Sequence, residues 1–257
     1  MARCKFETET WECPLEALPG EEYCYWHKEE EGKEPDDAKL GELKENEIFG
    51  AFLRKAKLSL KELQRTFLPY ANLEGADLWH ANLEGADLRG ANLEGAYLWG
   101  ANLQRADLQD ANLQSASLWG ANLQRADLQD VDLKGAGLLI VNLQRANLRD
   151  ANLQGADLSF ANLQGADLRH ANLEGANLIG VRVDAETRLD WANLTCANLY
   201  HSYLDETKTL RNAEFKSEKE INEIVADFLK RRNKDLAVLD VKKICLLYTS
   251  PSPRDRG

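Results

Sequence analysis

The sequence lacks the features that would mark a secreted, membrane-spanning or nucleic-acid-binding protein. No apolar run in its 257 residues approaches the roughly 18 residues that a membrane-spanning helix needs. Polar residues follow Met1, so no signal peptide is predicted, and five cysteines without such a signal favour a reducing, cytoplasmic compartment. The 32 Lys and Arg are outnumbered by 43 Asp and Glu, and the net charge of −11 argues against nonspecific nucleic-acid binding.

The chain also lacks any grouping typical of a catalytic site. His80, His170 and His201 each stand without a Ser, Cys or carboxylate at a spacing that indicates a catalytic partner. Glycines such as Gly75 and Gly85 recur at a fixed interval and form no phosphate-binding loop. We therefore expect that the protein is not an enzyme.

What the sequence has in abundance is a repeat of five residues. Leucine occupies every fifth position from Leu73 to Leu178, Ala stands two residues earlier except at Val131 and Val141, and Asn or Asp usually lies between them. The unit A-(N/D)-L-x-x is repeated 22 times over residues 71–180. This period would spread leucines around a whole helix, or onto both faces of a flat strand. It fits a solenoid coil in which each unit makes one side and one corner, with Ala and Leu pointing inward.

A second period of 20 residues indicates four sides per coil. Residues 98–110 and 118–130 have the same sequence, and Trp79, Trp99 and Trp119 share this offset. Here the sequence resembles the pentapeptide-repeat family. The resemblance implies an all-β fold, a right-handed quadrilateral parallel β-helix. Less regular units extend the solenoid to residues 48–205, with a one-residue slip after Val183.

The N-terminal segment has a pattern typical of metal ligands. The spacing C-x8-C-x10-C-x2-H is made by Cys4, Cys13, Cys24 and His27. Thiolates and imidazole are the ligands that tetrahedral zinc prefers, and four of them make a closed structural site. The segment resembles the WRC-type zinc motif of plant regulators, but an acidic run replaces the basic run that contacts DNA there. We predict a structural zinc ion in a module over residues 1–27; the alternative is a disordered tail with incidental cysteines.

The remaining boundaries follow from composition and helical patterns. Residues 28–47 are predicted as a solvated acidic linker, 28–37, followed by a short helix over 38–47 that covers the first coil. Residues 206–240 are predicted as a helical C-terminal cap, with an amphipathic helix over 218–232. We expect residues 241–257 to be a non-native or disordered tail, and the native chain to continue past about residue 245. Some similar multidomain proteins carry a small ion-channel module beyond such helices, so a membrane module lost from this end is one expectation.

One column of the repeat is apolar although its position faces water. It consists of Trp and aliphatic residues that directly follow the leucines, together with two apolar residues one position further along. Its members are Trp79, Trp99, Trp119, Leu139, Ile140, Phe160 and Ile179. Stacked aromatic side chains can simply stabilise a solenoid. The sharper interpretation is a contact surface for a protein partner, for a second copy of the chain, or for a domain lost from the C-terminal end, because such a stripe exceeds what monomers usually expose.

These observations favour a rigid, non-enzymatic scaffold for protein–protein interaction. The alternative is a DNA mimic that inhibits a type II topoisomerase such as gyrase, as some members of the family are. The block 71–180 makes roughly 5.5 coils, about 26 Å tall at about 4.8 Å per coil, and DNA of that length carries about 15 charges. The block has 14 acidic and 7 basic residues, a net charge of −7, and Arg105, Arg125 and Arg145 interrupt one face. The charge therefore favours the scaffold.

Overall fold

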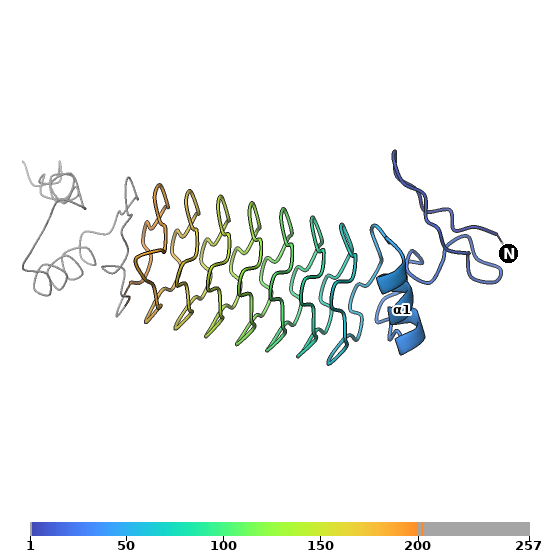
Figure 1. Cartoon of the computed structure of the whole chain (residues 1–257), viewed down its shortest axis with the longest axis horizontal. Coiled ribbons are helices and arrows are strands. Elements are labelled where there is room, and N and C mark those ends of the chain that lie inside the picture. Colours follow the sequence, from blue (N-terminus) through green and yellow to red (C-terminus); the bar gives the residue numbers. More distant parts are fainter. Residues whose placement is uncertain (1, 200–201, 203–257) are drawn as a thin grey trace, which may run out of the picture.

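The fold is a row of stacked coils with the N-terminal segment and one helix at one end (Figure 1). The computed structural model describes residues 2–199 and 202. Parallel bridges join the second residue of each five-residue unit to the residue 20 positions later, from Phe52↔Asn72 to Asn162↔Arg182. Four such bridges fall in each 20-residue coil, which therefore has four sides. The described residues contain these isolated bridges and no extended strands, because each side is too short for more than one bridge.

The corner of each unit turns at its fifth residue. That residue has a left-handed backbone in every unit from Gly50 to Gly180, with φ of 61° at Gly75 and 56° at Arg105. Glycine adopts this conformation without steric cost, which explains its recurrence there. The turn is closed by an amide that donates to a carbonyl three residues earlier, as Ala106 does to Leu103 at 3.1 Å. A turn after every five residues thus closes the chain into a four-sided coil.

The core contains the Ala and Leu positions of the repeat, as the sequence predicts. Ala101 and Leu103 are 0% and 1% exposed, and the same pattern continues from Ala71 to Leu199. The two valines that replace alanine, Val131 and Val141, are also fully buried. Each coil shares this core with its neighbours above and below, as expected of a solenoid.

Asparagine ladders hold successive coils in register. The Asn122 side-chain oxygen accepts hydrogen bonds from the Gln124 amide at 3.2 Å and from Asn142 Nδ2 at 3.1 Å. One bond fixes the corner of its own coil and the other joins the next coil. The preference for Asn or Asp before each leucine follows, because a short side chain with an acceptor oxygen can make both bonds.

The expected slip in register lies after Val183. The bridge from Asp167 reaches Arg188, an interval of 21 residues in place of 20. Asp184 and Thr187 stabilise the extra residue: the Asp184 carboxylate accepts from the Gly165 amide at 2.9 Å, and the buried Thr187 hydroxyl donates to the Leu163 carbonyl at 3.0 Å. The repeat then continues with the new register to Asn198.

Helix α1 (Asp37–Glu45) lies at the N-terminal end of the solenoid (Figure 1). The Asp36 side chain caps it by accepting from the Lys39 amide at 2.8 Å. Leu40 and Leu43 are buried and belong to the same core as the coils, so the helix covers that end. The helix begins one residue before the predicted start and ends two residues before the predicted end.

Residues 28–37, predicted as a solvated linker, keep their acidic side chains exposed, but their backbone is bonded to the first coil. The Gly32 amide donates to the Arg54 carbonyl at 2.9 Å, and the Lys57 amide donates to the Lys33 carbonyl at 2.8 Å. Lys33 itself is buried. The segment packs along the first coil because backbone groups at the end of a solenoid need hydrogen-bond partners.

The predictions for the C-terminal end of the chain lie outside the described residues. These predictions are the helix over 218–232 within the cap 206–240, and the tail 241–257. Within the described part, no helix has both the length and the apolar character needed to cross a membrane.

Candidate metal centre

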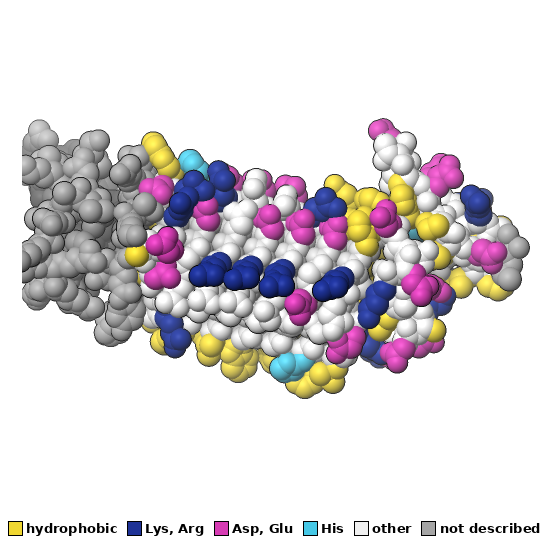
Figure 2. Space-filling model, viewed as in Figure 1, with side chains coloured by type: hydrophobic (Ala, Val, Ile, Leu, Met, Phe, Trp, Pro, Cys, Tyr) yellow, Lys and Arg dark blue, Asp and Glu magenta, His cyan; other side chains and the backbone are white. Residues whose placement is uncertain are grey.

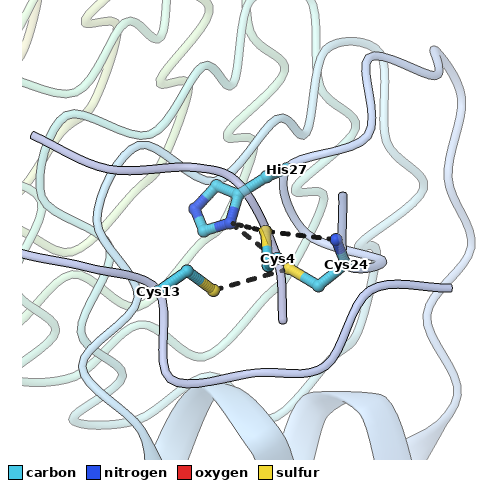
Figure 3. Close-up of side chains that lie close together, drawn as sticks. All are labelled: Cys4, Cys13, Cys24 and His27. Carbon is cyan, nitrogen blue, oxygen red and sulfur yellow. Dashed lines mark hydrogen bonds between the residues drawn. The ribbon is translucent and has the colours of Figure 1, made fainter. Parts of the chain in front are cut away.

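The predicted metal ligands come together from two parts of the N-terminal segment. A hairpin carries the first two: the Cys4 amide donates to the Leu15 carbonyl and the Cys13 amide to the Phe6 carbonyl, both at 3.0 Å. Cys24 and His27 follow on a tight turn, in which the His27 amide donates to the Cys24 carbonyl at 3.2 Å. All four side chains point toward one another (Figure 3).

The spacing of the donor atoms fits a tetrahedral ion. Bonds of about 2.3 Å to sulfur and about 2.0–2.1 Å to nitrogen place two sulfurs about 3.8 Å apart, and sulfur and nitrogen about 3.5 Å apart. Cys13 Sγ lies 3.8 Å from Cys24 Sγ, while His27 Nδ1 lies 3.5 Å from Cys4 Sγ and 3.3 Å from Cys24 Sγ. The four donor atoms lie within 4.8 Å of one another, and all four residues are buried. The cluster could therefore hold a metal ion.

The local hydrogen bonds favour a thiolate at Cys4 and at Cys24. The Cys24 amide donates to Cys4 Sγ at 3.2 Å, which stabilises negative charge on that sulfur. The hydrogen bond with Cys13, and then that with His27, lowers the pKa of Cys24 below its ordinary value. The same contact with Cys24, and then burial, raises the pKa of Cys13. The three cysteines are free thiols, so they remain available as ligands.

The His27 imidazole also has a partner at Nε2, the ring nitrogen that does not face the thiols. Its Nε2 lies 2.7 Å from the Phe49 carbonyl oxygen, at the start of the first coil. The Phe6 ring stacks on the imidazole with the ring centroids 3.9 Å apart. These contacts orient the His27 imidazole in the way that outer-shell partners usually orient a metal ligand.

A buried lysine beside the cluster was not predicted from the sequence. Lys33 Nζ donates to three carbonyl oxygens: Tyr25 at 2.6 Å, Lys28 at 2.6 Å and Phe52 at 2.9 Å. Burial lowers the pKa of Lys33 to about 8, and the three carbonyl contacts suit a charged ammonium near neutral pH. Lys33 thus ties the N-terminal segment to the first coil. Within an acidic run it has no sequence signal that separates it from a solvated lysine.

The predicted contact stripe lies on the solenoid, apart from the metal cluster. Trp79, Trp99 and Trp119 are 46%, 42% and 49% exposed, while Ile140 and Phe160 are 54% and 57% exposed. Leu139 and Ile179 are half-buried. The Trp99 and Trp119 rings contact edge to face with centroids 5.6 Å apart. The outward placement of the stripe is therefore confirmed, and its use as a contact surface stays a prediction.

A row of basic side chains runs along another part of the surface (Figure 2). Arg65, Arg105, Arg125 and Arg145 lie at one corner of the solenoid, at the fifth position of their units, with Gly85 at this corner in the coil between Arg65 and Arg105. All four are exposed, and none forms an ion pair within the described residues. These arginines therefore offer exposed positions, away from the apolar stripe, for control substitutions.

Comparison with known proteins adds family and fold. The family model described as "Pentapeptide repeats" matches residues 71–110, 106–138 and 142–181. The chain is similar to HetL of Nostoc sp. strain PCC 7120, a protein involved in heterocyst differentiation regulation. The two are 34% identical over 71% of this chain and 90% of HetL, with a TM-score of 0.35. No curated protein matches significantly.

Two further solved structures show how far these likenesses extend. Rfr23 of the cyanobacterium Cyanothece 51142 is 38% identical over 43% of this chain, with a TM-score of 0.33, and the chain spans 61% of the length of Rfr23. QnrB1, a plasmid-mediated fluoroquinolone resistance protein, is 16% identical over 78% of this chain and 94% of its own, with a TM-score of 0.57. At that identity, the likeness to QnrB1 shows the fold alone.

Proposed function

Because this chain belongs to the pentapeptide-repeat family, we propose that it is a non-enzymatic, rigid scaffold for protein–protein interaction, with a structural zinc ion in its N-terminal Cys/His cluster. The contact surface is the apolar stripe defined by Trp79, Trp99, Trp119, Leu139, Ile140, Phe160 and Ile179. The partner is another protein or a second copy of the chain.

The observation that carries the proposal is the alignment of half-exposed tryptophans on consecutive coils. Trp99 and Trp119 keep more than two fifths of their surface in contact with water although they contact each other. Tryptophan is among the residues most often found at interface hot spots. A regular ladder of backbone bonds holds these side chains in place, so a partner would order few groups when it binds.

Zinc is the proposed ion because of the donor set. Three thiols and one imidazole are typical of structural zinc sites, whereas calcium and magnesium prefer oxygen ligands. The segment over residues 2–27 has few buried apolar side chains, so a bound ion would contribute much of its folding free energy.

The contact surface can be tested by replacing two tryptophans together. We expect Trp99→Gln with Trp119→Gln to abolish self-association in sedimentation velocity, or to abolish binding of a partner that the wild-type chain captures. The matched control, Arg105→Gln with Arg125→Gln, changes exposed residues near the same coils and should leave both properties unchanged. A wild-type chain that stays monomeric and binds no partner, with early melting of the tryptophan variant, would make the stripe purely structural.

A further inference from the structure

The hydrogen-bond pattern between coils shows which backbone groups at the N-terminal end of the first coil have no partner in another coil. The amide of each fifth residue donates to the carbonyl of the fourth residue one coil later, as Gly75 does to Glu94 at 2.8 Å. The amide of each leucine donates to the carbonyl of the second residue one coil later, as Leu53 does to Asn72 at 2.7 Å. Carbonyls of the first coil must find these donors elsewhere, because no coil precedes it.

Two side chains of the N-terminal segment supply these missing donors. Phe49 is the fourth residue of its unit, and its carbonyl lies 2.7 Å from His27 Nε2. Phe52 is the second residue of its unit, and its carbonyl accepts from Lys33 Nζ at 2.9 Å. The Phe52 amide in turn donates to the Trp26 carbonyl at 2.6 Å. The segment over residues 26–33 therefore takes the place of a preceding coil along part of this edge.

We infer that zinc is bound through Nδ1 of His27 and that, by this ligand, zinc occupancy controls closure of the N-terminal edge of the solenoid. This inference rests on the proposed zinc site. A carbonyl oxygen only accepts hydrogen bonds, so the Phe49 contact requires the proton on Nε2. A neutral imidazole then has its lone pair on Nδ1, the atom that faces the thiols of Cys4 and Cys24. Metal binding and edge closure thus require the same tautomer of His27.

Phe6 provides a second connection between the cluster and the first coil. Its ring lies parallel to the His27 imidazole, at an interplanar angle of 5°. The Cζ edge of the ring approaches Gly50 so closely that a Cβ atom there would lie 2.8 Å from Phe6 Cζ. The ring therefore contacts both the proposed ligand His27 and the corner that starts the first coil. Loss of zinc removes the restraint on Cys4, His27 and the chain between them, and the edge loses its cover.

Hydrogen exchange on the full-length chain tests this coupling. We expect removal of zinc with a chelator to speed amide exchange at Phe52 and Lys57 by at least about tenfold, and re-addition of zinc to restore protection. Amides of the central coils, such as Asn102 and Asn122, should keep their protection and serve as the internal control. Unchanged exchange at Phe52 and Lys57 in protein shown to have lost its zinc would overturn the inference.

The ligating atom needs a separate readout. In the zinc-loaded, ¹⁵N-labelled chain, NMR should show the His27 proton on Nε2 and the metal on Nδ1; the reverse arrangement contradicts the inference. Metal analysis of the same sample separates the two proposals. A full equivalent of zinc without any change in exchange on its removal rejects the coupling and keeps the zinc site, whereas absence of zinc rejects both.

Discussion

The regular coils and the N-terminal segment meet the same need for hydrogen-bond partners in opposite ways. Within residues 71–181 each backbone bond is one of a series, and the same contact recurs one coil later. Between residues 2 and 45 almost every contact occurs once, as with the Lys33 ammonium and the His27 imidazole. The coils therefore depend on repetition, and the N-terminal segment depends on particular side chains.

This difference has a consequence for stability. A substitution in one coil alters one of many like contacts, and the neighbouring coils keep the same core and hydrogen-bond ladder. A substitution in the N-terminal segment removes a contact that nothing else replaces. Its effect should remain local to the first coil, because the carbonyls and amides of later coils have partners in adjacent coils.

The largest effect among single substitutions is expected inside the coils. Leu123 is 1% exposed in a central coil, and Leu123→Ala should lower the free energy of unfolding by about 2–5 kcal/mol, because the ladder above and below prevents collapse around the cavity. Urea unfolding measures the change. Asp127→Asn is the surface control and should stay within about 0.5 kcal/mol, since the new side chain keeps an acceptor oxygen for the Gln129 amide. Equal losses from both variants would contradict the assignment of inside and outside.

A smaller loss is expected from the buried lysine of the N-terminal segment. Lys33→Met keeps much of the volume but leaves the carbonyls of Tyr25 and Phe52 without this donor. We expect a loss of about 2–3 kcal/mol in the stability of the N-terminal segment, measured by hydrogen exchange. Lys28→Met, which changes an exposed ion pair, is the control and should have little effect. Equal protection in both variants would show that the Lys33 contacts contribute nothing.

The smallest effect concerns one rung of an asparagine ladder. Asn122→Ala removes the acceptor used by the Gln124 amide and by Asn142 Nδ2, and should cost about 1 kcal/mol in urea unfolding. Asn122→Asp keeps the acceptor oxygen and should retain most of the stability. If both variants lost the same amount, the ladder would owe its stability to something other than these bonds.

The solenoid could be predicted from sequence because its signal is repeated. The leucine period identified the buried positions, and the 20-residue offset identified the partners of every bridge, including the slip after Val183. Repetition converts a weak local pattern into many concordant observations. The same periodicity placed Trp79, Trp99 and Trp119 on the outside.

The candidate site was predictable only in part. Residue chemistry and spacing identified Cys4, Cys13, Cys24 and His27, because few residue types bind zinc. The contacts of His27 with Phe49 and of Lys33 with Phe52 join residues about 20 positions apart without any period. An acidic run around Lys33 indicates solvent exposure, and only the end of the solenoid, with its unpaired carbonyls, makes burial favourable.

Native mass spectrometry of the full-length chain tests most directly whether the N-terminal segment depends on a metal while the coils do not. We expect one zinc ion per chain after zinc-supplemented expression, lost in Cys13→Ser and retained in Cys196→Ser, which changes an exposed cysteine outside the cluster. The Cys13→Ser chain should keep the hydrogen-exchange protection of its central coils. Less than about a tenth of an equivalent of zinc in the wild-type chain, or full retention in Cys13→Ser, would contradict the account.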